Sequence, residues 1–285
     1  MLVTGAGGRL GATIVDAFKD AEVIAHTRAS LDITDQAAVS RAVADARPDV
    51  IINCAAFNDV DGAEDAPVAA LAVNAFAPRN LAVAARDVGA TLVHYSTDFV
   101  FDGKATQRPY DENDAPQPQS TYAASKLLGE WFALDAPTAY ILRVESLFGA
   151  PRGWGGRTGT MDAIVAGIEA GRDVRVFTDR VVSPSYTPDI AAATRHLLLS
   201  GGEPGLYHCV NSGQATWYEV AQSAGEILRA TPRLVPVSVK DVQFKARRPQ
   251  FCALSNQKLA AAGFTMPPWQ DAMRRWLGGR AIAAT

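Results

Sequence analysis

The first half of the chain alternates short apolar runs with longer stretches whose apolar residues recur every three to four positions. The short runs predict buried strands, and the periodic stretches predict helices between them. The expected strands occupy residues 1–4, 21–26, 50–56, 90–96 and 139–144, and the longest expected helix runs from about 68 to 88. Because strands that alternate with helices are joined by right-handed crossovers, the pattern predicts an α/β fold, a Rossmann-type doubly wound parallel sheet.

The pattern changes near Gly149, where a glycine-rich loop that also carries arginines, residues 149–160, follows the last of these strands. Such a loop predicts a mobile flap. Beyond it we expect shorter, mixed elements: a helix at 187–199 capped by Thr187, a strand at 205–211, and a helix at 216–228 that opens with a Thr216–Glu219 capping box. We therefore expect a dinucleotide-binding domain at 1–150 and, at 151–285, mostly a smaller substrate-binding lobe, with some segments returning to the first domain.

The 285 residues, 48% hydrophobic and 20% charged, have the composition of an ordinary globular protein. A net charge of −3 gives no general attraction to nucleic acid or anionic lipid, and no apolar run looks long enough to span a bilayer. The three scattered cysteines suit a reducing compartment and form no disulfide framework or zinc pattern, and the four histidines have no ligand spacing. We therefore expect a cytoplasmic protein with no metal, no nucleic-acid partner and no membrane partner, and we leave a homodimer open.

Three glycines, Gly5, Gly8 and Gly11, follow the first expected strand and open the first helix with the spacing GxxGxxG. A turn without Cβ atoms lets a pyrophosphate approach the backbone, and the free N–H groups of a helix start bind an anion. At this junction the motif predicts a dinucleotide site that includes Arg9 and Leu10, and the alternative is a plain tight turn. Only four residues precede Gly5, fewer than the ~5–6 of a usual strand, so we expect the natural start to lie upstream.

The end of the second expected strand bears on the choice of nicotinamide cofactor. NAD sites usually carry an acidic residue there, whereas an arginine accommodates the 2′-phosphate of NADP. Here the strand runs into HTRASLD, so Arg28 is available and no acid occurs before Asp32. The pattern favours NADP(H), with NAD(H) as the alternative, and the opposing interpretation is that Arg28 and Arg9 are ordinary solvated residues.

Tyr122 and Lys126 lie four residues apart in the segment STYAASKLLGEW, at the start of a predicted helix. Residues i and i+4 are neighbours on one helical face, so a phenol and an ammonium at this spacing can act together. An accidental pair on a solvated face is the alternative. The surroundings of the pair must therefore decide its meaning.

The motifs occur in one order: GxxGxxG, then STDFVFDG at residues 96–103, then the Tyr122–Lys126 pair. In this the chain resembles the extended short-chain dehydrogenase/reductase superfamily and, within it, the dTDP-4-dehydrorhamnose reductase family. Further segments look like family segments in the family's order: RPDVIINCAAFNDVDGAED, YAASKLLGE, SPSYTPDIA, GLYHCVNSGQATWYE and RRPQFCALSNQKL. The resemblance implies an NAD(P)H-dependent reductase that acts on the 4-keto group of a nucleotide-linked deoxysugar.

The resemblance implies that Thr97, Tyr122 and Lys126 form the catalytic trio. Hydride delivered to a ketone carbon builds charge on the oxygen, which needs a proton donor, and Tyr122 would be that acid. A free phenol titrates near 10, so the nearby ammonium of Lys126 would favour the phenolate. In the family the same lysine holds the nicotinamide ribose, and Thr97 would donate to the substrate carbonyl.

Further contacts are implied by position. Asp32 would lie near the adenine, and Asp98 would face the sugar hydroxyls. A guanidinium fork matches phosphate oxygens, so Arg247 or Arg248 would meet the substrate diphosphate, unless the two are a solvated pair after a turn. The residues expected to line the adenosine side are Asn53, Ala55 and Ala56, where Asn53 could instead be a strand-end turn residue.

One segment departs from the family pattern. Where rhamnose-forming members usually read Arg-Thr-Ser-Trp-Val-Tyr-Gly, residues 143–149 read RVESLFG. The tryptophan is absent, and Glu145 and Ser146 are the residues expected at the substrate there. This change predicts a more open and more polar pocket, suited to an amino-bearing or more hydroxylated sugar, and a poor fit for dTDP-4-dehydrorhamnose.

Other functions are compatible with this fold. One branch similar to this family is a regulatory subunit of methionine adenosyltransferase that binds NADP without clear reductase chemistry. Epimerases and dehydratases of the superfamily are the further alternatives. Dehydratases tend to carry Asp-Glu after the threonine, whereas here Asp98 is followed by Phe99, and epimerases usually carry small residues there, so reduction is preferred.

Overall fold

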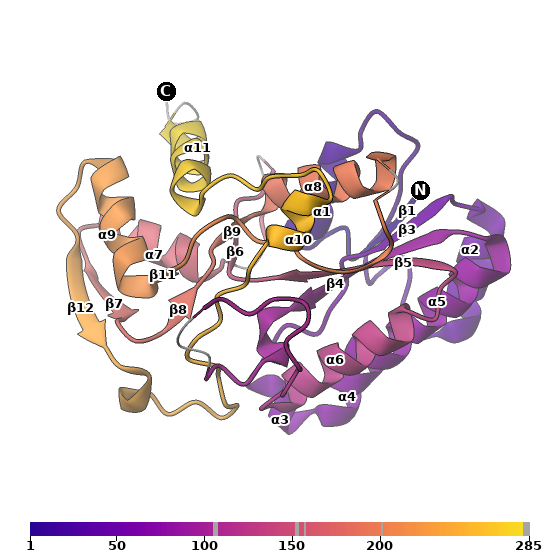
Figure 1. Cartoon of the computed structure of the whole chain (residues 1–285), viewed down its shortest axis with the longest axis horizontal. Coiled ribbons are helices and arrows are strands. Elements are labelled where there is room, and N and C mark those ends of the chain that lie inside the picture. The colour runs from indigo at the N-terminus through magenta and orange to yellow at the C-terminus, as the bar shows by residue number, and fades with distance from the viewer. Residues whose placement is uncertain (105–107, 152–153, 157, 201, 282–285) are drawn as a thin grey trace.

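A six-stranded parallel sheet forms the centre of the molecule (Figure 1). The computed structural model describes residues 1–104, 108–151, 154–156, 158–200 and 202–281. The strand order is β10-β5-β4-β3-β1-β2, and every pairing in this sheet is parallel. The strands are β1 (Leu2–Thr4), β2 (Ile24–His26), β3 (Val50–Asn53), β4 (Thr91–Thr97), β5 (Thr138–Val144) and β10 (Gly205–His208). The predicted doubly wound α/β sheet is confirmed.

Helices cover both faces of the sheet, because successive strand residues point to opposite sides. Leu2, Ile51, Leu92 and Ile141 join one buried cluster, whereas the residue that follows each of them joins another. The first cluster includes residues of α2 (Gln36–Ala46) and α5 (Ala77–Val88), and α6 (Thr121–Ala133) contributes Ala133. The second is covered by α1 (Arg9–Ala17) and α8 (Thr187–Ser200). The apolar runs of the sequence are therefore strands buried on both sides.

The long predicted helix is confirmed as a continuous stretch, Pro67–Val88, with an internal change of winding. It consists of α4 (Pro67–Leu71), the π-helical turn η1 (Ala72–Phe76) and α5. Its most apolar 18-residue window has a mean hydropathy of 1.4, so by length and composition alone this helix could cross a membrane, and the interpretation that no run has this length is wrong. Of its most apolar window, 56% is buried, against α2, α6 and β4 among others.

The second lobe packs its own apolar core beside the sheet (Figure 1). Its buried residues include Val165, Val220 and Trp276, which come from three different helices. The Thr216–Glu219 capping box is confirmed at the start of α9. The elements of this lobe are α7 (Thr160–Glu169), β7 (Asp173–Phe177), β8 (Val181–Val182), β11 (Ala215–Thr216), α9 (Trp217–Leu228), β12 (Arg233–Val237) and α11 (Trp269–Ala281).

The chain returns from this lobe to the sheet at α8 and β10, so the two parts are interleaved in sequence. α8 begins at Thr187 itself, whose hydroxyl donates to the carbonyl oxygen of Gly149 at 3.1 Å. Helix ends commonly shift by one residue between criteria, so this differs little from the expected cap. The short remaining elements are α3 (Gly62–Asp65), η2 (Asp98–Val100), β6 (Leu147–Phe148), β9 (Ser185–Tyr186), η3 (Val239–Asp241) and α10 (Gln257–Ala261).

Candidate active site

The carboxyl ends of adjacent sheet strands bring the predicted site residues to one edge. Thr97 of β4 pairs with Val144 of β5, so Asp98 and Glu145, the next residue of each segment, leave the sheet side by side. The glycine turn follows β1 at the same edge. Open parallel α/β sheets bind their ligands at this edge, so the fold places the predicted cofactor and catalytic residues where a ligand would lie.

Two glycines of the turn leave no room for a side chain. Gly5 has a φ of 69°, and a Cβ there would lie 2.5 Å from the amide nitrogen of Ala55. A Cβ on Gly11 would lie 2.2 Å from the carbonyl oxygen of Gly5. The N-cap of α1 is Gly8, which offers no side-chain acceptor to the first amides of the helix. This geometry suits a bound pyrophosphate.

The side chain of Arg9 contacts other residues of the protein in this structure. Its guanidinium forms an ion pair with Asp162 at 2.5 Å, donates to Gly149 O at 3.2 Å and stacks on Trp154 at 4.9 Å. The Trp154 indole in turn donates to Gly7 O at 3.1 Å, so part of the predicted flap lies against the glycine turn. The contact between Arg9 and a cofactor stays a prediction. The flap residues outside the described ranges are 152, 153 and 157.

Arg28 and Asp32 lie exposed beyond β2. Asp32 accepts hydrogen bonds from the hydroxyl and the amide of Thr34 at 2.7 and 3.0 Å. These bonds, and to a smaller extent the charge of Arg28, lower the pKa of Asp32. Arg28 therefore lies near Asp32 with its charge in solvent, which is compatible with a 2′-phosphate contact.

Asn53 is buried and its side chain is used within the protein. Its Oδ1 accepts from the Thr4 hydroxyl at 2.7 Å and from the Ala55 amide at 3.1 Å, and its Nδ2 bonds to His94 Nδ1 at 3.0 Å. The alternative interpretation of Asn53 as a strand-end turn residue therefore fits better than direct contact with adenosine. Ala55 and Ala56 are partly exposed at the same edge, as the prediction requires.

Tyr122 and Lys126 lie in the first two turns of α6, which begins after the N-cap Ser120. The Ser120 hydroxyl accepts from the Ala123 amide at 3.2 Å, a bond typical of a helix start. Both predicted catalytic side chains are buried, at 8% exposure for Tyr122 and 3% for Lys126. The interpretation of the pair as an accident of a solvated surface is therefore wrong.

The protonation of the pair differs from the sequence expectation. Burial, followed by the charge of Asp98, raises the pKa of Tyr122, while a hydrogen bond with Thr97 acts in the opposite direction. Burial lowers the pKa of Lys126 to about 8, and its Nζ donates to Tyr95 O at 2.6 Å. The groups that shift the pKa of Tyr122 are therefore Asp98 and Thr97, where the sequence predicted Lys126. In this structure Tyr122 is a neutral acid.

Asn74 supports this helix and was missed in the sequence. It lies in the π-helical turn η1. Its side-chain Oδ1 accepts from Phe57 N at 2.8 Å, and its Nδ2 donates to Ser125 Oγ at 3.0 Å. A Cβ on Gly129 would lie 2.0 Å from Asn74 O, so α6 and η1 pack backbone to backbone. Single π turns often mark functional sites, but nothing in the residue pattern signals one.

A group of buried polar residues lies beside Thr97. The Thr97 hydroxyl donates to Asp98 Oδ1 at 2.9 Å, and Asp98 and Glu145 are each only 3% exposed. Asp98, Glu145 and Cys252 each bring one potential ligand atom within 4.8 Å of the others. The charge of Arg180 acts on all three groups, and burial raises the pKa of the Cys252 thiol. A positive neighbour and a protonated thiol do not favour a metal ion.

Glu145 and Ser146 offer less to a substrate than expected. Glu145 Oε2 accepts from Ser183 N at 2.8 Å, and Oε1 is buried, so neither oxygen is open to a ligand. Ser146 is partly exposed, has a φ of 47° and accepts from Ser185 N through its carbonyl at 3.3 Å. The predicted polar pocket wall is therefore not formed by Glu145. Arg180 and Cys252, which sequence reasoning missed, carry no local motif.

The two predicted diphosphate contacts differ in surroundings. Arg248 bonds to Asp61 at 2.6 Å and stacks on Phe244 at 4.4 Å, so it joins the second lobe to the segment before α3. Arg247 is exposed. The contact between either arginine and a substrate stays a prediction.

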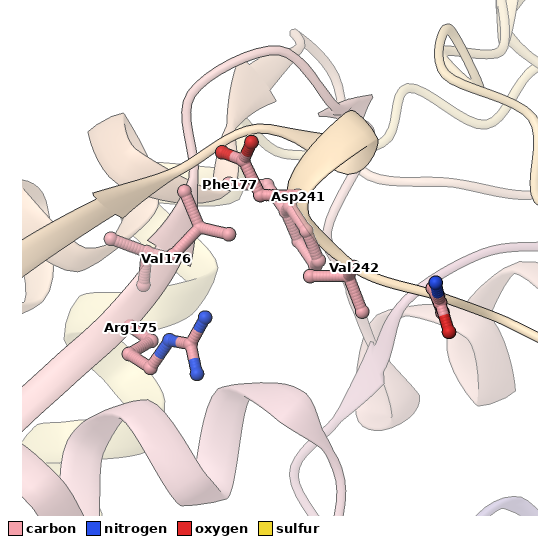
Figure 2. A pocket seen from close by; sticks show the side chains of 7 residues that line it. Arg175, Val176, Phe177, Asp241 and Val242 are labelled. Atoms are coloured by element: carbon pink, nitrogen blue, oxygen red, sulfur yellow. The ribbon is translucent and has the colours of Figure 1, made fainter.

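A cavity of about 250 Å³ opens in the second lobe between β7, the end of β12 and η3 (Figure 2). Val176, Phe177 and Val242 give it apolar walls, and Arg175 and Asp241 add charged groups. Arg180 of the buried polar group follows Phe177 of the cavity wall by three positions in the sequence. Such a lining suits a flat, partly polar ring.

Comparison with known proteins agrees with this geometry. A curated relative, the dTDP-4-dehydrorhamnose reductase of Mycolicibacterium smegmatis, is 40% identical over 96% of this chain and 84% of its own. A structure of dTDP-4-dehydrorhamnose reductase from Clostridium acetobutylicum has a TM-score of 0.91 at 32% identity, covering 97% and 98% of the two chains. A structure of the Bacillus anthracis enzyme in complex with NADP has a TM-score of 0.90 at 31% identity, covering 97% of each chain. The profile of the RmlD substrate binding domain matches residues 1–280, and the chain belongs to this family.

Proposed function

We propose that the protein is an NAD(P)H-dependent reductase of a 4-keto nucleotide-linked deoxysugar. The observation that carries this proposal is the convergence of Thr97, Tyr122 and Lys126. All three are more than nine-tenths buried, and they lie at the sheet edge that also carries the glycine turn. Relatives of this length named dTDP-4-dehydrorhamnose reductase support the reaction class. The regulatory-subunit, epimerase and dehydratase alternatives have no such support.

The hydride would come from a dinucleotide bound on the glycine turn, with NADP(H) preferred and NAD(H) as the alternative. The solved relative in complex with NADP and the exposed Arg28 support the preference. The cofactor would supply the hydride, while Gly5, Gly8 and Gly11 admit its pyrophosphate to the backbone. Lys126 would then exchange Tyr95 O for a ribose hydroxyl.

Neutral Tyr122 would give its proton to the oxygen of the reduced ketone. Its raised pKa keeps the proton on the phenol until the oxygen becomes strongly basic. Thr97, next to both Tyr122 and Asp98, would hold that oxygen in place. Burial around these groups excludes water from the reacting atoms.

The nucleotide half of the substrate would lie on the second lobe. We propose the cavity of Figure 2 for the base and Arg247 or Arg248 for the diphosphate. This agrees with the predicted domains, in which residues 1–150 bind the cofactor and residues 151–285 mostly bind the substrate. The exceptions are β10, which is a strand of the central sheet, and α8, which covers one face of it.

A homodimer and a cytoplasmic location are parts of this proposal that rest on the sequence. Trp131 of α6 and Phe76 of η1 are 59% and 50% exposed, which supports an apolar contact between copies. Sedimentation of the wild type and of Trp131→Glu would test it, and a wild type that sediments as a monomer would contradict it.

The deciding experiment is a turnover assay that follows NADPH absorbance with 4-keto nucleotide sugars. Tyr122→Phe should lower kcat by about 10² or more and leave NADPH binding intact, because only the proton donor is lost. Tyr218→Phe, in α9, is the control and should turn over like the wild type. Equal turnover by Tyr122→Phe and the wild type would overturn the assignment.

A further inference from the structure

Asp98 and Glu145 form a buried carboxyl pair in which each group has one satisfied oxygen and one unsatisfied oxygen. Asp98 Oδ1 accepts from Thr97, and Glu145 Oε2 accepts from Ser183 N. In the part of the chain that the structure describes, Asp98 Oδ2 and Glu145 Oε1 are buried and have no hydrogen-bond partner. One oxygen of each group lies within 4.8 Å of the other. If both groups were ionised, neither of these oxygens would have a donor, whereas a proton on one of the two carboxyl groups supplies one.

The charges around the pair lead to the same requirement. The guanidinium of Arg180 acts on both carboxyl groups through its charge and supplies a single positive charge. Cys252 adds no charge, because its thiol keeps its proton, donates to Pro249 O at 3.3 Å and also lies within hydrogen-bonding reach of the Asp98 carboxyl group. Two ionised carboxylates would leave an excess negative charge away from water, which is costly. One proton shared by the pair makes the group of Asp98, Glu145 and Arg180 neutral.

The pKa values agree with a shared proton. Burial raises the pKa of Asp98 to about 6, although Arg180 opposes the shift. Burial and then the charge of Asp98 raise the pKa of Glu145 well above its usual range. Like carboxyl groups that meet in a site without water lose their protons in two separate steps. Near neutral pH such a pair holds one proton.

Thr97 connects this pair to the acid of the reaction. Its hydroxyl donates to Asp98, accepts from Phe99 N at 3.2 Å and also faces the phenol of Tyr122. We propose that Asp98 and Glu145 hold one proton between them and return it through the Thr97 hydroxyl to Tyr122 in each turnover. This proposal rests on the proposed function, because it concerns the tyrosine left without its proton after ketone reduction.

The proton balance closes over one cycle. Tyr122 loses its O–H proton to the alkoxide and becomes a phenolate. The Thr97 hydrogen then moves to the phenolate oxygen. The Asp98 carboxyl group turns so that its protonated oxygen faces Thr97, and this proton moves to the Thr97 oxygen, so one O–H bond forms for each that breaks. The pair is left with two negative charges beside Arg180 and regains one proton from water. No atom is oxidised or reduced in these proton transfers.

The first test needs no substrate. Difference infrared spectroscopy between the wild type and Glu145→Gln at neutral pH should show the carbonyl band of one protonated carboxyl group in the wild type. Asp98→Asn should lose the same band, although it leaves Glu145 in place, because the Asn amide donates to Glu145 and lets it ionise. Glu226→Gln, exposed on α9, is the control and should keep the band. A wild type without the band overturns the shared proton.

The second test concerns turnover. In Glu145→Gln the first turnover uses the proton already on Tyr122, so a burst of NADPH oxidation should appear, followed by a kcat about tenfold below that of the wild type. The deficit should grow as pH rises, since solvent protons become scarcer. An effect on KM alone, or an equal loss in the burst and in kcat, would show a structural role and overturn the relay.

The two tests keep the proposals distinguishable. If the wild type has the band but reduces no nucleotide sugar, the proposed function and the relay fall while the shared proton stands. If the wild type turns over but lacks the band, only this inference falls. Thermal melting shows whether Glu145→Gln folds, and Asp98→Asn tests the relay in its place if it does not.

Discussion

At the scale of the residue, the sequence identifies the chemistry better than the protonation. The spacing drew attention to Tyr122 and Lys126, because a helix brings positions i and i+4 together, and the family resemblance of the surrounding motifs then implied their catalytic roles. Their pKa values depend on burial and on Asp98, which only the packed fold supplies. Arg180 and Cys252 could not be found, because they reach Asp98 from distant segments without a motif.

The depressed pKa of Lys126 predicts how stability depends on pH. In the unfolded chain this ammonium titrates near 10.5, and in the folded protein near 8. Between these values the unfolded state binds more protons, so folding stability rises with pH across this window. We expect the free energy of unfolding of the wild type to rise relative to Lys126→Met by up to about 3 kcal/mol from pH 8 to 10.5.

Urea unfolding of both proteins at several pH values measures this difference. Lys240→Met, at an exposed lysine of η3, is the control and should track the wild type. A difference between the wild type and Lys126→Met that stays constant with pH would contradict the shifted pKa.

Cofactor preference is also decided by single residues. NADPH should bind about ten- to a hundredfold more tightly than NADH, because a guanidinium–phosphate contact contributes about 1.5–3 kcal/mol. Arg28→Ala should reduce this gap, whereas Arg41→Ala, exposed on α2, should keep it. Fluorescence titration with both cofactors gives the ratio, and equal affinities in the wild type would sink the assignment.

At the scale of the element, most strands and helices were predicted because burial on both faces gives parallel strands continuous apolar runs. The helix Pro67–Val88 shows what apolar runs cannot distinguish. Pro67–Val88 is as apolar as a membrane span, and its burial against other helices is a tertiary fact that composition does not contain. The π turn around Asn74 has no sequence signature for the same reason.

The glycine turn gives a prediction at this scale. Gly11→Ala should lower the free energy of unfolding by about 1–3 kcal/mol, because its Cβ would lie 2.2 Å from a backbone oxygen that cannot move without shifting β1 or α1. Gly7→Ala is the matched control, since the nearest atom to its Cβ would lie at 3.6 Å, and it should change stability by less than about 0.5 kcal/mol. Equal melting temperatures for the two variants would contradict the packing argument.

At the scale of the whole molecule, the ion pair between Arg248 and Asp61 joins the second lobe to the segment before α3. A nucleoside diphosphate bound near it would contact both parts and so stabilise the molecule as a unit. The sequence predicted that some segments of the second half return to the first domain, but not which ones. The return of β10 depends on its pairing with β5, a contact between residues that are far apart in the sequence.

We therefore expect at least one of dTDP, UDP and GDP, added with NADPH, to raise the melting temperature. A ligand at a hundred times its Kd stabilises by about 2.7 kcal/mol, which is a measurable shift. Arg247→Ala and Arg248→Ala, compared side by side, should show which arginine meets the diphosphate, because only that variant loses the shift. The absence of a shift with all three nucleotides would count against a nucleotide-sugar substrate. Efficient reduction of dTDP-4-dehydrorhamnose would show that the missing tryptophan matters little.

The chain leaves the sheet after β5 and returns to it only at α8 and β10, so the parts of the molecule cannot be separated by a single cut. A fragment ending at residue 150 would lack α8, and the apolar face that contains Ile14 and Leu142 would lose its cover from Ile190 and Leu197. Exposed patches of this kind promote self-association. A chimaera that exchanges sugar specificity between relatives would therefore need three crossover points, after β5, before α8 and after β10, so that each sheet keeps its own last helix and strand.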